Sequence, residues 1–350
     1  QAGTIVNGIV DRKDDHIKVF LEADVRSAVD SGFSRYRFEH NALPEIDFSK
    51  IDISMKFFGR RINMPLIISS ITGGGHRSEK INKGLAEIAH DFNLGIAVGS
   101  QRPAIEDRSR ETSFKIRNYA PNILLFANLG AVQLNYGYSL DECRRAVEMI
   151  DADALILHLN PLQEVFQPGG NTGFAGLLGK IEKICAGLQA PVVVKEVGYG
   201  ISSPVAKKLL DVGVAVIDVA GAGNISWGAI EGYRSNDIVV RNCSRTFSSW
   251  GNPTAECVRS IAKNVKGIKI IASGGVETGV DVAKSIALGA DICGNASGFL
   301  RHIAESRAAC ENFVESVMLE LKTAMFCIGC KNIQELKSAK LRRAGDELVL

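Results

Sequence analysis

The sequence predicts an α/β fold, a TIM (β/α)8 barrel preceded by an N-terminal extension with a hairpin plug. Eight short apolar runs recur along the chain, and each is continuous, as expected for strands buried on both faces of a parallel sheet. Segments with helical spacing lie between them. Eight such units close into a barrel more naturally than they form an open sheet. The runs begin at Pro65, Leu94, Ile123, Ala154, Pro191, Val214, Ile268 and Ala290.

The segments between these runs have the periodicity of amphipathic helices. Residues 78–92 place Ile81, Leu85, Ile88 and Phe92 on one face, because residues at i, i+4 and i+7 are neighbours on a helix. Some segments open with a capping residue or an early proline, which marks the first turn. Further helices are therefore expected at 140–150, 202–211, 253–265 and 278–288.

The chain divides into three parts. Residues 1–64 form an extension that holds a substrate-clamp segment and a hairpin at 51–62, with its turn near Gly59. We expect this hairpin to plug the amino-terminal end of the barrel. Residues 65–330 form the barrel, and residues 331–350 a short helix and a loose end. Two long connections, 160–175 and 221–251, are expected to be lids or substrate clamps at the catalytic face.

Composition excludes several classes of partner. A net charge of +2 gives no reason to propose nucleic acid or a membrane surface. No stretch has the roughly 18 consecutive apolar residues of a membrane span, and the N-terminus lacks the apolar segment of a secretory signal. The eight cysteines are scattered, and Cys327 and Cys330 have no second pair at zinc spacing. Reduced thiols in a cytoplasmic protein are expected, with a redox pair as the weaker alternative.

Two glycine-rich loops predict a phosphate site. They are ASGGVETG at 272–279 and GNASG at 294–298, which follow the seventh and eighth strands. In TIM barrels these loops often hold a phosphate against backbone N–H groups and a helix N-terminus. Either motif alone is also compatible with an ordinary turn, so it is their joint position that favours phosphate.

Lys195 ends an otherwise apolar strand, where a buried charge needs compensation. Three roles are open: a Schiff-base lysine of an aldolase, an ion pair with Glu196, or a cation beside a flavin. Polar groups at the ends of neighbouring strands, Thr72, Ser100 and Asn128, could hydrogen-bond a flat heterocycle. They favour the flavin.

The sequence HLNPLQE ends the fourth strand with His158, Asn160, Gln163 and Glu164. One carboxylate among neutral amides suits Mg²⁺, which takes few protein carboxylates and completes its shell with phosphate and water. It does not suit zinc, which prefers several His or Cys ligands. The alternative is a helix-capping glutamate on a solvated loop.

A second anion clamp is suggested near the N-terminus. Arg12, Lys13 and His16 lie together in RKDDH, and Gln101 and Arg102 follow the second strand. Such a charge cluster is more often simply solvated surface.

The chain resembles the type 2 isopentenyl-diphosphate isomerases, which are FMN-dependent TIM barrels. The resemblance spans about residues 7–336 and rests on RKDDH, SSITGG, VGSQR, ANLGA, HLNPLQE, VVVKEVG, DVAGAG with SW, and SGGVETG, in that order. It implies an enzyme that interconverts isopentenyl and dimethylallyl diphosphate without net redox change, in isoprenoid biosynthesis. It also implies reduced FMN, Mg²⁺, NADPH as the reductant, and a homo-oligomer of four or eight subunits.

The resemblance also assigns residues. FMN would contact Ser69, Ser70, Ile71, Thr72, Ser100, Asn128, Lys195, Ala220, Ile225, Gly274, Gly275, Ala296 and Ser297. Substrate would contact Arg12, Lys13, His16, Ser100, Gln101, Arg102, Asn160 and Gln163. Glu164 would bind Mg²⁺. The catalytic residues would be Gln163, Glu231, His158 and Lys195, with proton transfer assisted by Gln163 and Glu231.

Three positions in two loops depart from the family pattern. After the sixth strand the family commonly has GAGGTS, whereas this chain has Asn224 and Ile225; Glu277 stands where arginine is usual. A carboxylate there repels phosphate. Two alternatives follow: an FMN-dependent 2-hydroxy-acid oxidase or dehydrogenase, and a degenerate barrel that binds FMN or another phosphate compound. The oxidase would need a catalytic histidine and an arginine pair after strands six and seven, which are absent.

Overall fold

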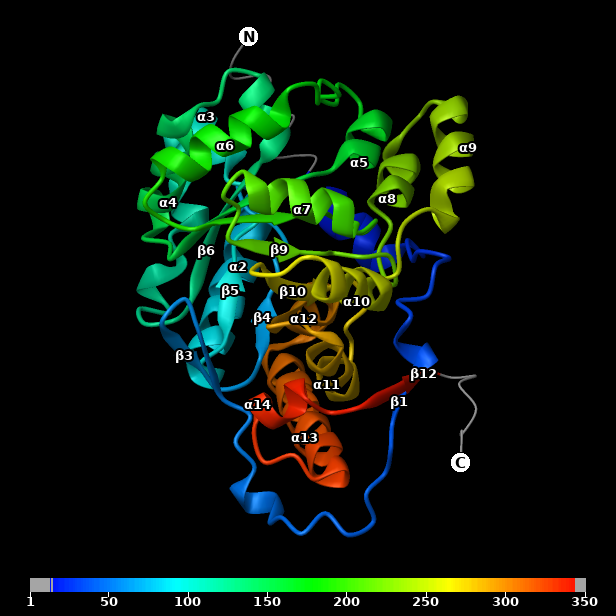
Figure 1. Ribbon diagram of the computed structural model, residues 1–350. Helices are drawn as coiled ribbons and strands as arrows, with labels where there is room; N and C mark the ends of the chain where they lie inside the picture. The colour runs from blue at the N-terminus through cyan, green and yellow to red at the C-terminus, as the bar shows by residue number, and fades with distance from the viewer. Residues whose placement is uncertain (1–12, 14, 344–350) are drawn as a thin grey trace.

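A closed barrel of eight parallel strands forms the centre of the molecule (Figure 1). The computed structural model describes residue 13 and residues 15–343. Each strand pairs with the next along the chain, and β11 closes the ring onto β4, which confirms the predicted fold class. The strands are β4 (Leu66–Ile68), β5 (Gly95–Ala97), β6 (Leu125–Gly130), β7 (Ala154–His158), β8 (Val192–Lys195), β9 (Val216–Asp218), β10 (Lys269–Ser273) and β11 (Ile292–Asn295).

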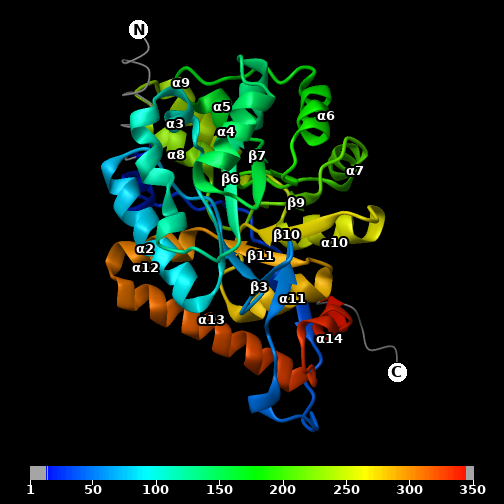
Figure 2. The same cartoon turned by 90° about the vertical axis from the view of Figure 1, so that its left-hand side faces the viewer.

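Helices surround the barrel, as Figure 2 shows from the side. The five predicted helices are confirmed to within two residues, and two of them begin with a reciprocal capping box, Ser139 with Glu142 and Thr278 with Asp281. The outer helices are α2 (His76–Phe92), α3 (Arg102–Glu106), α4 (Leu140–Ile150), α6 (Leu177–Gly187), α7 (Ser203–Asp211), α10 (Thr254–Asn264), α11 (Gly279–Leu288), α12 (Ser297–Glu305) and α13 (Arg307–Ile328).

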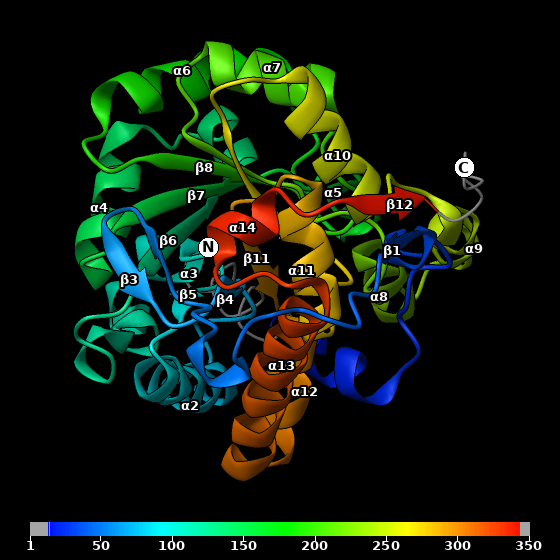
Figure 3. The ribbon, with the colours of Figure 1, turned by 60° about the horizontal axis from the view of Figure 1, so that its bottom comes forward.

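The predicted hairpin covers the amino-terminal end of the barrel (Figure 3). Strand β2 (Met55–Phe57) pairs antiparallel with β3 (Arg60–Ile62). Phe57 and Ile62 are buried in one cluster with residues at the starts of the barrel strands. Arg60 forms an ion pair of 2.7 Å with Asp153, just before β7. The hairpin therefore closes the lower end of the core, and the upper end remains for chemistry.

Truncating the plug is expected to destabilise the protein. Phe57→Ala removes a ring that is 2% exposed, and large-to-small changes of this kind cost about 3–5 kcal/mol. The free energy of unfolding in urea measures the loss. Lys56→Ala, at an exposed position of the same strand, is the control and should change stability by less than about 0.5 kcal/mol. Equal effects of the two substitutions would contradict the plug.

The two long connections contain helices, which the sequence analysis did not identify. The first holds α5 (Pro161–Phe166), and the second holds α8 (Trp227–Arg234) and α9 (Ile238–Thr246). The side chains of Ser226 and Asp237 cap α8 and α9. Of the nine residues of α9, only Ser244 is buried, so the helix has no apolar face against the core that a sequence pattern could reveal.

The C-terminal segment is also more ordered than expected. After α14 (Ile333–Lys337), strand β12 (Leu341–Arg343) pairs antiparallel with β1 (Tyr36–Phe38). The expectation of a loose end is therefore wrong for residues 341–343; the remainder lies outside the described residues. Short 3-10 turns complete the fold: η1 (Phe33–Arg35), η2 (Phe48–Lys50), η3 (Arg108–Phe114), η4 (Ile116–Asn118), η5 (Ala131–Asn135) and η6 (Phe247–Ser249).

Two further properties concern the environment of the protein. All eight cysteines are free thiols, including Cys327 and Cys330. Among the described residues, no helix combines the length and apolar character that crossing a lipid bilayer requires.

Candidate active site

A cavity opens at the carboxyl ends of the barrel strands, and residues that follow all eight strands line it. Of the predicted site residues within the described chain, all line this cavity except Gln101 and Glu231. Arg12 lies outside the described residues. The fold therefore brings the residues predicted to bind flavin, an anion and a metal ion into one cavity. In the sequence these residues are spread over nearly 300 positions.

Lys195 is buried at the end of β8, and its Nζ donates to the backbone carbonyl of Glu196 at 2.6 Å. The Glu196 carboxylate instead accepts from the N–H groups of Val197, Gly198 and Tyr199, at 2.6–2.8 Å. Burial raises the pKa of Glu196 to about 7, against the opposing effects of those bonds and Lys195. The structure thus shows a backbone turn held by Glu196, and not the Lys195–Glu196 ion pair that the sequence left open.

His158 is neutral. Burial and the charges of Lys195 and Lys13 lower its pKa to about 3. Its Nδ1 lies 2.8 Å from Asn128 Oδ1, while Asn128 Nδ2 donates to Ser70 Oγ at 2.8 Å. Because the amide oxygen accepts, Nδ1 carries the proton, and Nε2 is left as an acceptor. His158 can therefore accept a hydrogen bond in the cavity, but it does not supply a positive charge there.

Sequence reasoning missed Asp218 at the end of β9. It is 1% exposed and pairs in register with Lys195. Its Oδ1 accepts from Ser273 Oγ at 2.5 Å, and burial raises its pKa. The next residue but one, Ala220, has a positive φ of 35°, a strained value for a residue with a side chain. A single aspartate within an apolar run was the available signal.

Gln101 is held by hydrogen bonds within the barrel wall. Its side chain is completely buried, and Nε2 donates to the carbonyl of Ala146 at 2.9 Å. Its Oε1 accepts from the backbone N–H of Asn128 at 2.9 Å. Gln101 therefore ties β6 to α4, and both ends of its amide are satisfied away from the cavity. The contact of Gln101 with substrate stays a prediction, and this geometry leaves only its backbone for it.

The metal candidate, Glu164, lies on α5 and is 7% exposed. Asn160 Nδ2 donates to its Oε1 at 2.9 Å, and the Asn171 N–H donates to its Oε2 at 2.5 Å. Asn160 Oδ1 is buried without a hydrogen-bond partner. The described residues contain no group of three or more His, Cys, Asp or Glu that could hold a metal. A carboxylate beside an orphaned amide oxygen still suits a hard cation that takes further oxygens from a ligand.

The glycine-rich loop at 272–279 packs tightly against the loop after β9. A Cβ at Gly274, where φ is +93°, would lie 2.1 Å from the carbonyl oxygen of Gly221, so glycine is required there. Ser69 Oγ faces this region without a partner. Two departures from the family pattern contact each other: Asn224 Nδ2 donates to Glu277 Oε1 at 2.6 Å and to Ser297 Oγ at 2.7 Å. The amide thus binds the acidic group beside the site.

The N-terminal segment reaches the cavity. Residues 15–22 are helical, and Lys13 Nζ donates to the carbonyl of Ser100 at 2.6 Å. The His16 ring packs edge-on against Trp227, with centroids 5.2 Å apart. Arg102 pairs with Glu106 at 2.7 Å and lines the same mouth. Lys13 and Arg102 thus bring two cations to the cavity from separate parts of the chain.

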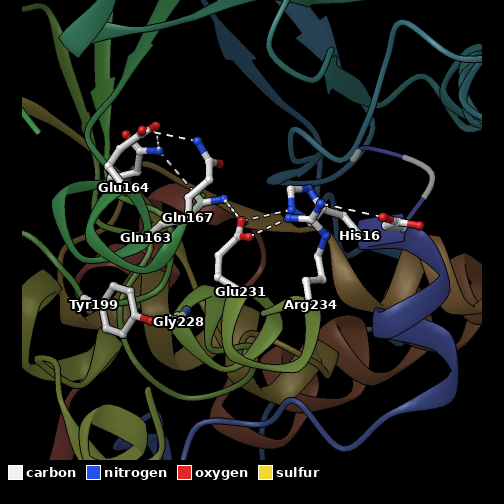
Figure 4. A network of polar contacts seen from close by, with 10 residues as sticks. His16, Gln163, Glu164, Gln167, Tyr199, Gly228, Glu231 and Arg234 are labelled. Atoms are coloured by element: carbon white, nitrogen blue, oxygen red, sulfur yellow. Dashed lines mark hydrogen bonds and ion pairs between the residues drawn. The ribbon is translucent and has the colours of Figure 1, made fainter. Parts of the chain in front are cut away.

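Glu231 on α8 does not line the cavity, but it contacts His16 and Gln163, which do (Figure 4). Its Oε1 lies 2.9 Å from His16 Nε2 and accepts from Gln163 Nε2 at 3.0 Å, while its Oε2 accepts from Arg234 at 2.7 Å. Burial raises the pKa of this carboxyl, but His16, Gln163 and Arg234 outweigh it and hold the pKa at about 2. Glu231 is therefore an ionised group that acts on the cavity through Gln163 and His16.

Comparisons with known proteins agree on the fold. The model of the FMN-dependent dehydrogenase family matches residues 175–343. A crystal structure of mandelate oxidase with (S)-2-phenylpropionate has a TM-score of 0.64 and 18% identity, covering 97% of this chain and 98% of that one. At that identity the likeness extends to the barrel architecture alone.

Other relatives are more similar in sequence and align over most of the chain. Isopentenyl-diphosphate delta-isomerase of Nostoc sp. is 51% identical over 334 residues, which cover 95% of each chain. The enzyme of the same name from Stutzerimonas stutzeri is 46% identical, covering 95% of this chain and 97% of its own. Identity of this extent over 95% of the chain places it in the isopentenyl-diphosphate delta-isomerase family.

Proposed function

We propose that this protein is an FMN-dependent isomerase that interconverts isopentenyl diphosphate and dimethylallyl diphosphate. The observation that carries the proposal is the joint lining of one cavity by Lys195 and Asn128, by the cations Lys13 and Arg102, and by Glu164. A flavin site alone would not need the second anion clamp or the carboxylate. Family membership supports the same reaction.

FMN fits the barrel side of the cavity. Ser69 Oγ lacks a partner, Asn128 and Lys195 offer donors, and the loops at 272–279 and 294–298 offer backbone N–H groups. Reduced FMN would supply an electron-rich ring able to shuttle a proton and to stabilise positive charge, with NADPH as the electron source. The role of Lys195 would be to place a positive charge beside the ring, in surroundings where burial strengthens electrostatic interactions.

The diphosphate is proposed to lie at the cavity mouth. Lys13, His16 and Arg102 would bind its oxygens, and Glu164 with Asn160 Oδ1 would hold Mg²⁺ against it. Mg²⁺ would supply charge neutralisation and orientation. Binding energy from this remote group can then position the reacting carbons and keep water out. Trp227 and Ile225 form apolar parts of the wall beside them.

Proton transfer is assigned to the side chains around Gln163. An unactivated alkene is a weak base, so its protonation needs a well-placed donor and stabilisation of adjacent positive charge. Gln163 lines the cavity and donates to the ionised Glu231, which polarises its amide. His158 contributes as a neutral acceptor. The negative charge of Glu231 would also favour developing positive charge on the substrate.

The decisive experiment is an anaerobic assay. The protein is purified, examined for a flavin spectrum, and supplied with FMN, NADPH, Mg²⁺ and isopentenyl diphosphate. We expect dimethylallyl diphosphate to form without net consumption of NADPH. Oxidation of a 2-hydroxy acid instead would favour the oxidase alternative. A colourless protein that FMN does not reconstitute would contradict both flavin functions and leave a degenerate phosphate-binding barrel.

Two substitutions test the proton assignment. Glu231→Gln removes the charge and keeps the shape, and Gln163→Ala removes the amide; each is expected to lower kcat roughly 10²- to 10⁴-fold, the range for general acid–base groups. Substrate binding should change much less, because the anion clamp is intact. Near-normal turnover in either variant, measured by product formation under anaerobic conditions, would rule out that residue's role.

Glu277 is expected to weaken FMN binding. Its carboxylate is exposed beside the glycine loops, so a phosphate there is repelled through solvent. Glu277→Gln should tighten FMN binding roughly two- to fivefold at low salt, a gain that shrinks at high ionic strength. Quenching of FMN fluorescence by the flavin-free protein measures this. Glu305→Gln, at the far end of α12, is the control and should leave affinity unchanged.

We also propose a homo-oligomer of four or eight subunits in the cytoplasm. The family resemblance supports the assembly, and the free thiols, of which Cys243 is exposed, are compatible with a reducing compartment. Light scattering on a sizing column tests the subunit number.

A further inference from the structure

Arg234 does not line the cavity, but it contacts the buried carboxylate of Glu231. It lies on α8, three residues after Glu231, and only 14% of its side chain is exposed. One guanidinium nitrogen donates to Glu231 Oε2 at 2.7 Å, and another lies 3.6 Å from Asp15 on the N-terminal helix. Figure 4 shows the guanidinium on the side of Glu231 nearest to His16.

The Glu231 carboxylate has donors on both oxygens. Gln163 and His16 approach Oε1, and Arg234 approaches Oε2. Gln163 and Arg234 can only donate here, one to each oxygen, and this arrangement favours the ionised form of Glu231. Because the side chain is 0% exposed, water does not stabilise its charge, and the neighbouring donors and cations must do so.

Arg234 is the permanent cation of this cluster. The other charged and titratable groups around Glu231 are His16 and Asp15 on the N-terminal helix and Tyr199 in the loop after β8. Helix α5 contributes the neutral Gln163, and α9 packs on α8 where Ser244 faces Gly232. An imidazole loses its charge near neutral pH, whereas a guanidinium does not.

We propose that Arg234 is a positioning residue that keeps Glu231 ionised and thereby fixes the orientation of the Gln163 amide at the reacting centre. The proposal rests on the proposed function for its catalytic consequence. Its electrostatic part holds for the folded protein whatever the reaction. An ionised Glu231 can only accept, so the Nε2 end of the Gln163 amide must face it. The Oε1 end then faces Asn160 Nδ2, which donates to it at 3.1 Å.

The sign of the effect follows from the causes acting on Glu231. In the native protein its pKa is lowered to about 2, although burial alone raises it. With the guanidinium removed, burial opposes ionisation with less compensation, and the pKa rises. Arg234→Gln should therefore move the acidic limb of the kcat/KM profile to higher pH, with activity recovering as the pH rises further. Arg234→Lys keeps the charge and should largely retain the native profile.

The kinetic experiment compares four anaerobic pH profiles: native protein, Arg234→Gln, Arg234→Lys and the control Arg241→Gln, an exposed arginine on α9. The proposal expects at least a tenfold loss for Arg234→Gln at about pH 6 and a smaller loss at about pH 8.5. An unchanged profile, or an equal loss at every pH, would overturn it. A native protein without isomerase activity would instead refute the proposed function.

A second experiment needs no activity. Urea unfolding midpoints are measured at about pH 5 and pH 8 for Arg234→Gln, Glu231→Gln and the double variant. Burying an unpaired carboxylate is most costly when it is charged, so Arg234→Gln should be more destabilising at the higher pH. That pH difference should vanish in the double variant, which has no titrating group at 231. A difference that persists there would show that Glu231 is not the group Arg234 controls.

Discussion

Lys195→Met is expected to lower isomerase turnover by about 10²- to 10³-fold, the loss found when one preorganised electrostatic donor is removed. The substitution keeps the length of the side chain and deletes the cation at the end of β8. Burial raises the pKa of both neighbouring carboxyl groups, Asp218 and Glu196, and neither can replace the lost positive charge. Such a change disfavours an anionic reduced ring more than a neutral oxidised one.

The measurement for Lys195 has two parts. Product formation under anaerobic conditions gives the rate, and a redox titration gives the potential of bound flavin, which should fall. Lys183→Met on the surface of α6 is the matched control and should alter neither. A variant with a normal rate and potential would show that the lysine is structural. Retention of activity would also remove the remaining argument for a Schiff-base role, since that role requires the amine.

Glu164→Gln is expected to raise the Mg²⁺ concentration needed for half-maximal activity by a factor on the order of 100. Asn160 and the Asn171 N–H donate to different oxygens of Glu164, so the single amide oxygen of glutamine keeps one of these bonds while the ligand charge is lost. Activity measured against Mg²⁺ concentration tests this. Glu182→Gln, exposed on α6, serves as the comparison. An unchanged Mg²⁺ dependence would leave Glu164 as a residue that only holds the α5 turn.

The barrel was predictable because its signals are local. Each strand is a short continuous apolar run, and each of the five predicted helices has one apolar face that a few turns of sequence reveal. The site residues at strand ends followed from the same rule, since parallel strands bring their carboxyl ends to one side. Thus Lys195, Asn128 and Glu164 could be located before any coordinates were known.

The elements that the sequence did not predict, α9 and β12, have no such local pattern. Helix α9 has a single buried residue, so capping by Asp237 and contacts with α8 define it more than periodicity does. Strand β12 exists only because it meets β1, some 300 residues away in sequence. The side-chain bonds of Gln101 to Ala146 and Asn128 were not predictable either, because its place in a motif does not say which way its side chain points.

By itself, the sequence determined the barrel, the end at which chemistry takes place and the residue types available there, because periodicity and strand direction act over short stretches of chain. Only the tertiary structure decided which of those groups act on one another. Arg234 and His16 reach the same carboxylate from positions more than 200 residues apart, and Asn224 reaches Glu277 across two loops. The ionisation of a buried group depends on such neighbours in space, so its chemistry is settled by packing.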